Sequence, residues 1–226
     1  MNFISHFSLD RFHPDSEYLV GVCIPDLLSI YNRKLRIKHL SHHLHFPLPL
    51  QKFYQGIVRH YDTDKIFHTC EFFERECNVV SADLRKMFPD GSAKRSFFVA
   101  HVLIEILIDK ILIEEDNQLV RDFYFHLHKI GAVRITEMTQ AFLDTPASTF
   151  SGFLQKFLDN EYLYHYESYE YIIFVLKRIV GRVGIEETAY MDTPVFLEYL
   201  REFEKKIKPE IGELFVFLHK NLPKPE

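Results

Sequence analysis

Residues 96–115 read SFFVAHVLIEILIDKILIEE, and this stretch decides the fold class. Its polar residues recur at helical intervals, and nearly every residue between them is apolar. The pattern predicts an α-helix at about residues 94–115. Because apolar residues surround the polar ones, we expect much of this helix to be buried.

The rest of the chain has the same helical spacing, and no segment alternates in the manner of a β-strand. No repeat or linker divides it. We therefore predict an all-α protein, a single domain over residues 1–226 built as a bundle of about seven helices. The expected segments are an apolar stretch at 16–31 interrupted by Pro25, a basic, His-rich connection at 32–50, and helices near 51–80, 94–115, 117–143, 148–163, 167–182 and 193–221.

Composition narrows the function classes. The chain has 27 Lys plus Arg against 32 Asp plus Glu, a net charge of −5, which argues against a general nucleic-acid binder. Cys23, Cys70 and Cys77 form no CxxC pair, so we expect reduced thiols. We find no signal-peptide pattern and no membrane span, and we expect a cytoplasmic protein without a membrane partner. The 22 Phe predict an aromatic core, whereas the 13 His need a separate explanation.

The helix at 96–115 carries a stripe of polar groups. His101, Glu105 and Asp109 follow i, i+4 and i+8, so they lie on one face. Carboxylates in an apolar setting are costly unless they are paired, hydrogen-bonded or bound to a metal. The stripe is therefore either a polar edge paired with Arg or Lys of a neighbour, or a set of metal ligands.

A second stripe lies in RHYDTDKIFHTC, residues 59–70, where His60, Asp64 and His68 repeat the same spacing. Two facing helices, each with imidazole and carboxylate groups, can form a mixed N/O site suited to Mn, Fe, Zn or Mg. The alternative is a solvated face on which the histidines cap or pair.

The N-terminal region adds His6, in MNFISHF, and Asp26, in YLVGVCIPDLL. A single histidine of this kind is more often structural than a ligand, and Asp26 would serve as an N-cap for residues 27–31. Without the two stripes, neither His6 nor Asp26 would be considered a candidate ligand.

Four motifs occur in the order and spacing of the acyl carrier protein phosphodiesterases: MNFISHF (1–7), YLVGVCIPDLL (18–28), QGIVRHYDTDKIFH (55–68) and LIEILIDKIL (103–112). That family resembles distant members of the HD-type metal-dependent phosphohydrolases. The resemblance covers most of the chain, including SYEYIIFVLKRIVGRVG (168–184). It implies an HD-domain-like fold and hydrolysis of the phosphodiester that links 4′-phosphopantetheine to acyl carrier protein. The implied cofactor is a divalent metal, Mn first, with Fe, Mg or Zn as alternatives.

The resemblance also assigns roles to residues. The metal ligands that it implies are Asp26, His60, Asp64, Glu105 and Asp109, and the residues that orient phosphate or move a proton are His6, His68 and His101.

The chain departs from the family pattern at four of its motif positions. Tyr61 stands where the family has Arg, His68 and Glu105 stand where it has Asp, and Lys110 stands where it has His. His and Glu keep a group that can bind a metal, whereas the loss of Arg and His leaves the substrate open.

A dense basic run, RKLRIKH at 33–39, stands out in this acidic chain. Its Arg33, Lys34, Arg36 and Lys38 are candidates for docking an acidic carrier protein or a phosphate-bearing ligand, with a solvated loop as the alternative. The histidines of the same connection match no standard ligand spacing, so we interpret them as a polar loop: His39, His42, His43 and His45.

Three functions remain in view. The first is an acyl carrier protein phosphodiesterase, and the second is an HD-like phosphohydrolase that acts on another small phosphoester. The third is a non-catalytic helical binding protein whose site has decayed. No Gly-rich phosphate loop, Ser nucleophile elbow or redox Cys pair supports another enzyme class.

Overall fold

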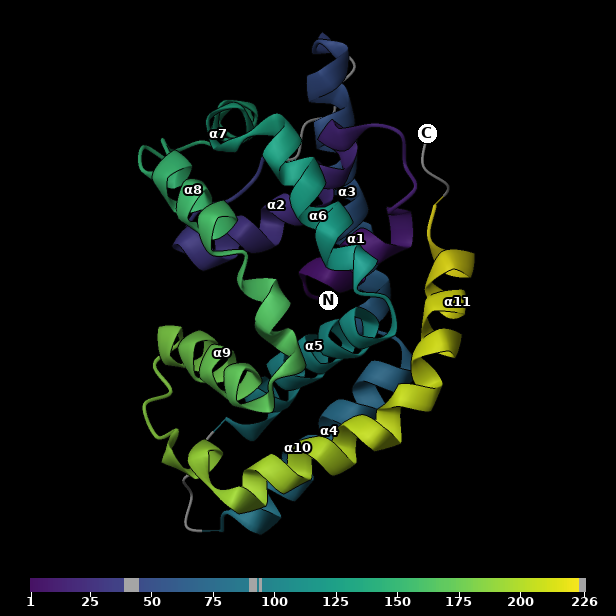
Figure 1. Cartoon of the computed structure of the whole chain (residues 1–226), viewed down its shortest axis with the longest axis vertical. Coiled ribbons are helices and arrows are strands. Elements are labelled where there is room, and N and C mark those ends of the chain that lie inside the picture. The colour runs from purple at the N-terminus through teal and green to yellow at the C-terminus, as the bar shows by residue number, and fades with distance from the viewer. Residues whose placement is uncertain (39–44, 90–92, 94, 224–226) are drawn as a thin grey trace. The chain divides into compact units, whose positions relative to one another are not determined.

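The computed structural model describes residues 1–38, 45–89, 93 and 95–223, and these residues form helices without any β-strand (Figure 1). The all-α prediction is confirmed. The loop residues His39, His42 and His43 lie outside the described residues. The α-helices are α1 Phe3–Asp10, α2 Ser16–Asn32, α3 Leu48–His68, α4 Glu71–Met87, α5 Ser96–Glu115, α6 Gln118–Ile130, α7 Ala132–Gln140, α8 Phe150–Asn160, α9 Tyr169–Arg182, α10 Pro194–Ile207 and α11 Ile211–Asn221.

The count of about seven helices is not confirmed, because several expected segments are divided among the described helices. Cys70 has an extended backbone and caps α4, which separates α3 from α4. Gly131 ends α6 with a φ of +82°, a conformation that glycine adopts without a steric cost. A short 3-10 turn that contains Pro209 stands between α10 and α11.

Pro25 lies inside α2 instead of interrupting it. Proline removes one intrahelical hydrogen bond and crowds the preceding turn, so a helix that contains it needs support from packing. The neighbouring Ile24, Leu27 and Leu28 are buried and supply that support. Asp26 therefore sits within α2 and is not the N-cap of a helix at 27–31.

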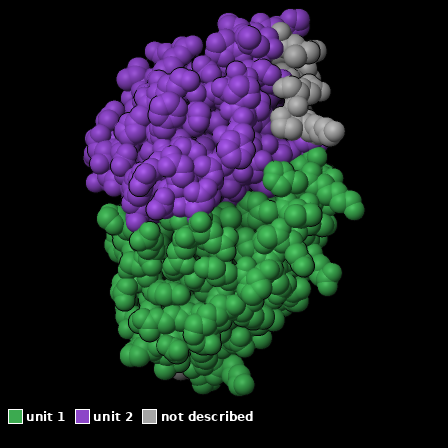
Figure 2. Space-filling model, turned by 45° about the vertical axis from the view of Figure 1, so that its right-hand side comes forward, with its two compact units in different colours: residues 1, 65–115, 165–222 green, residues 2–64, 116–164, 223–226 purple. Residues whose placement is uncertain are grey.

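The contacts divide the chain into two compact units, which we describe separately (Figure 2). Unit 1 comprises residues 1, 65–115 and 165–222, and unit 2 comprises residues 2–64, 116–164 and 223–226. α3 contributes residues to both. The single domain over residues 1–226 stays a prediction.

Unit 2 has an aromatic core made by α1, α6 and α8. Phe3 packs against Phe123 and Phe157, with ring centroids 6.2 and 5.7 Å apart, and Phe7 meets Phe123 at 5.7 Å. Such edge-to-face and tilted arrangements are favourable for aromatic pairs. They agree with the aromatic core expected from the composition, and they fix α1, which carries His6.

The backbones of α2 and α3 approach each other closely within unit 2. A Cβ on Gly21 would lie 2.1 Å from the carbonyl oxygen of Phe53, and a Cβ on Gly56 would lie 2.0 Å from that of Tyr18. Only glycine permits this approach. His60 follows Gly56 by one helical turn, so the same contact brings its side chain to α2.

Unit 1 is built around α5, which is buried on nearly all sides, as the sequence predicts. α4 and α10 are joined by two polar contacts: Glu76 with Lys206 at 2.6 Å, and Asp83 with Tyr199 at 3.1 Å. Lys110 of α5 is also buried, and its Nζ lies 3.2 Å from Glu204. Lys110 therefore belongs to the packing of unit 1.

The described part of the chain contains no helix with both the length and the apolar character that crossing a membrane requires. α5 is the longest strongly apolar helix, and its polar stripe interrupts the apolar surface.

Candidate metal centre

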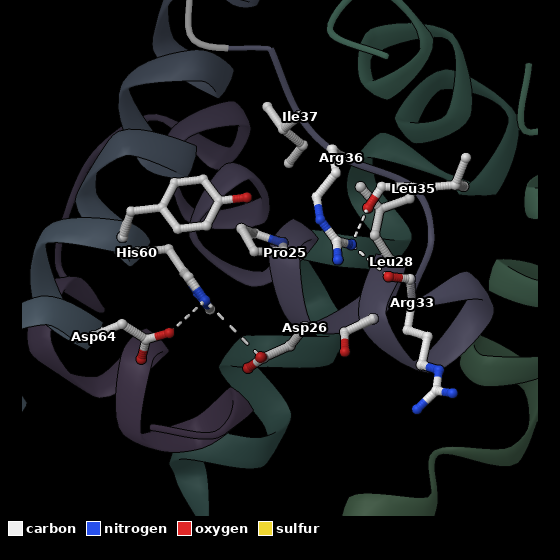
Figure 3. Close-up of a pocket in the computed structure, with 11 residues that line it drawn as sticks. Pro25, Asp26, Leu28, Arg33, Leu35, Arg36, Ile37, His60 and Asp64 are labelled. Atoms are coloured by element: carbon white, nitrogen blue, oxygen red, sulfur yellow. Dashed lines mark hydrogen bonds and ion pairs between the residues drawn. The ribbon is translucent and has the colours of Figure 1, made fainter. Parts of the chain in front are cut away.

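Four of the predicted residues meet in unit 2, where three helices contribute one or two side chains each. His6 comes from α1, Asp26 from α2, and His60 and Asp64 from α3. The Nε2 atom of His60 lies 3.4 Å from Asp64 and 3.9 Å from Asp26 (Figure 3). The Nε2 atom of His6 lies 3.1 Å from Asp64. We call this set the α1–α3 group.

The backbone of α2 orients His60. Its Nδ1 lies 2.8 Å from the carbonyl oxygen of Val22, which can only accept a hydrogen bond. Nδ1 therefore carries the proton, and Nε2 faces Asp26 and Asp64 (Figure 3). A neutral imidazole would point a lone pair at two carboxylates, so this arrangement calls for a cation, either a proton on Nε2 or a metal ion. Metal-binding histidines are commonly held in this way through their second nitrogen.

The pKa values of the two histidines move in opposite directions. Burial lowers the pKa of His60, but the charge of Asp26 and the contact with Asp64 outweigh it, so the pKa is raised. Burial and the neighbouring charge of His60 lower the pKa of His6 to about 3. The two rings are stacked, with centroids 3.8 Å apart, and two imidazolium ions at this distance would repel each other. His6 is therefore neutral.

The donor set fits a divalent cation. One ligand atom each from His6, Asp26 and His60 lie within 4.8 Å of one another. Atoms that surround a cation at ~2.0–2.6 Å are roughly 3 to 5 Å apart. The buried Nδ1 atom of His6 has no hydrogen-bond partner among the described residues, which is unusual for a buried nitrogen. Burial alone would raise the pKa of Asp64, but nearby positive charge outweighs it and hydrogen bonds with His6 and His60 add to the effect. The pKa is therefore below its usual range, and the carboxylate is charged.

A cavity of about 290 Å³ opens onto this group. Asp26, His60 and Asp64 form part of its wall. The rest comes from α2, from the segment that follows it and from α3: Pro25, Leu28 and Ser29 of α2, Arg33, Leu35, Arg36 and Ile37 of the segment, and Tyr61 of α3. The end of that segment is fixed, because Lys38 donates its backbone N–H to Phe142 at 2.8 Å.

Arg36 is the cation best placed at the cavity. Its guanidinium donates to the backbone carbonyls of Arg33 and Leu35, the latter at 2.9 Å, which holds it in the wall (Figure 3). The Arg33 side chain points away from His60 in the same view. Lys38 forms an ion pair with Asp144 at 2.8 Å.

Three further predicted residues meet in unit 1. His68 of α3 and His101 of α5 place their Nε2 atoms 2.9 and 3.1 Å from Glu105 Oε1. Asp109, the next member of the predicted stripe, is fully buried and does not belong to this set. We call His68, His101 and Glu105 the α3–α5 group. The three histidines assigned to proton transfer thus lie in the two ligand groups.

Two backbone features of the site were not predicted from the sequence. The Val22 carbonyl that orients His60 has no side-chain signal. Gly21 and Gly56 did provide one, since both fall inside apolar helical segments where glycine is unfavourable and signals close approach.

Comparison with known proteins returns no match: no family model fits the chain, and no curated protein or solved structure matches it.

Proposed function

We propose that the protein is a metal-dependent phosphoester hydrolase whose divalent cation is held by Asp26, His60 and Asp64, with His6 beside them. The observation that supports this proposal most directly is the orientation of His60, whose Nδ1 is fixed by Val22 and whose Nε2 faces two carboxylates. Imidazole with carboxylate is the donor set that Mn, Fe and Zn accept.

A divalent cation in such a site supplies charge neutralisation for a phosphate and lowers the pKa of water. Residues of the chain would position the phosphate. Arg36 is exposed, and after its two backbone contacts it keeps further N–H donors for the oxygens of a phosphate.

Tyr61 offers a second contact to the same ligand, because it also lines the cavity. Burial raises the pKa of Tyr61, so its hydroxyl keeps its proton at neutral pH and can donate a hydrogen bond. A neutral donor thus stands where the resembled family has a cation.

The substrate that the resemblance favours is the phosphodiester of 4′-phosphopantetheine on acyl carrier protein. Three exposed cations support docking of an acidic protein: Arg33, Lys34 and Arg36. Lys38 contributes less, since it is already paired with Asp144. The second candidate is another small phosphoester, and the replacement of Arg by Tyr61 at the cavity favours it.

The test is a hydrolysis assay with Mn²⁺ on two substrates, holo-acyl carrier protein and bis(p-nitrophenyl) phosphate. Removal of the phosphopantetheine, seen by mass, supports the first substrate, and release of nitrophenol alone supports the second. We expect Asp64→Asn to reduce either rate at least 100-fold, while His128→Gln, an exposed histidine of α6, leaves it unchanged. Metal binding without hydrolysis of either substrate would leave the non-catalytic binding protein as the remaining function.

A further inference from the structure

We propose that the α3–α5 group, His68, His101 and Glu105, is a second metal-binding site, which takes a late first-row cation such as Zn²⁺. This inference does not depend on the proposed hydrolase activity, because it concerns different residues in unit 1.

The three ligand atoms already converge. His101 and Glu105 are one turn apart on α5, and His68 comes from the end of α3. One atom from each of the three lies within 4.8 Å of the others. Tetrahedral bonds of ~2.0–2.1 Å separate ligands by roughly 3.3 Å. The 2.9 and 3.1 Å separations to Glu105 Oε1 therefore need only a few tenths of an ångström of outward movement to admit an ion.

Aromatic packing holds both imidazoles in place. The ring of Phe73 meets His68 and His101 edge-on, with centroids 5.0 and 4.9 Å away. Phe67 also contacts His68, at 5.3 Å. Ligands whose rotamers are fixed by their neighbours lose little entropy when they bind a metal.

Three nitrogen atoms surround one oxygen of the Glu105 carboxylate. Besides the two imidazoles, the α-amino group of Met1 donates to Glu105 Oε1 at 3.0 Å. Three nitrogens around one oxygen exceed its two lone pairs. A divalent cation that accepts Glu105 and both imidazoles as ligands would relieve this crowding.

The group is partly exposed to solvent. The side chains of His68 and His101 are 30 and 32% exposed, and that of Glu105 is 15% exposed. An ion can therefore enter, and three protein ligands leave a coordination position for water or for a further ligand. Two nitrogens with one carboxylate favour Zn²⁺ over Mg²⁺ or Ca²⁺, which prefer oxygen ligands.

The experiment measures metal bound to the whole chain. Protein stripped with a chelator is dialysed against Zn²⁺, and bound zinc is counted by mass spectrometry. We expect two ions in the wild type and one in the His68→Ala/His101→Ala variant. We also expect one ion in His60→Ala/Asp64→Ala and two in His219→Gln, which changes an exposed histidine of α11.

A second set of measurements uses a substitution that barely changes the shape of the side chain. Glu105→Gln keeps the side-chain volume, and we expect it to weaken the binding of the ion in unit 1 at least tenfold, with unchanged circular dichroism. We expect visible absorption when Co²⁺ binds the His60→Ala/Asp64→Ala protein. We expect this absorption to be lost when His101→Ala is introduced into the same variant. If the His68→Ala/His101→Ala variant binds as much zinc as the wild type, with equal affinity, the proposal is wrong. Loss of hydrolase activity has no bearing on these readouts.

Discussion

His6 and His60 show how strongly surroundings decide the chemistry of a side chain. Both are buried, and their rings are stacked, yet their pKa values move in opposite directions. Burial lowers the pKa of both, and the charge of His60 lowers that of His6 further. At His60 the charge of Asp26 and the contact with Asp64 outweigh burial. Residue type and spacing identify all four side chains as candidates. The hydrogen bond to Val22 that fixes His60 depends on tertiary structure, so the sequence could not predict it.

The three cysteines allow the burial of individual side chains to be tested. All three are buried and form no disulfide among the described residues. Burial, with the charges of Glu105 and Glu76, raises the pKa of Cys77 to about 12. The thiolate is the reactive form, so the native thiol should stay unreactive well above pH 8. We expect no labelling of Cys77 by iodoacetamide at pH 8 within an hour, and labelling of all three cysteines in guanidinium. A rate in the native protein equal to that in guanidinium would contradict the buried position.

At the scale of helices, the apolar periodicity of the sequence predicts where a helix lies better than it predicts where a helix is interrupted. The helix expected at 94–115 is α5, Ser96–Glu115, and the one expected at 167–182 is α9, Tyr169–Arg182. Both have continuous apolar spacing. The interruption predicted at Pro25 was wrong, because proline is disfavoured inside a helix by local rules, whereas the burial of its neighbours outweighs those rules in α2. Tertiary packing is invisible to a local pattern.

The close contact between α2 and α3 at their glycines leads to a prediction about how these two helices pack. In Gly21→Ala, the new Cβ would meet the backbone oxygen of Phe53 at 2.1 Å, which cannot yield without moving a helix. We expect a loss of about 1–3 kcal/mol in the free energy of unfolding, measured by urea denaturation, together with weaker Mn²⁺ binding. The matched control is Gly152→Ala on α8, where nothing lies within 4 Å, and there we expect a gain of about 0.4–1 kcal/mol. Equal effects of the two substitutions would exclude a close helix contact at Gly21.

At the scale of the whole molecule, a helical stripe tells which residues share a face but not which element they face. His60, Asp64 and His68 follow one stripe on α3, and their spacing led us to expect that this stripe faces the one on α5. The structure associates His60 and Asp64 with His6 and Asp26 in unit 2, and His68 with His101 and Glu105 in unit 1. The ligand types were predictable, and their division between two groups was not, because it depends on where the chain divides into units.

This division predicts that the two metals protect different amides. An ion that binds only the native state stabilises it by RT ln(1 + [L]/Kd), about 2.7 kcal/mol at 100 times Kd. Hydrogen exchange with saturating Mn²⁺ should therefore slow in α1, α2 and the part of α3 before residue 65. With Zn²⁺ added to His60→Ala/Asp64→Ala protein, slowing should be confined to α4, α5 and the end of α3 from residue 65, and Glu105→Gln should abolish it. Zinc-dependent protection of α1 and α2 in that variant would show that the ion binds elsewhere, because the α3–α5 group holds residues of unit 1 alone.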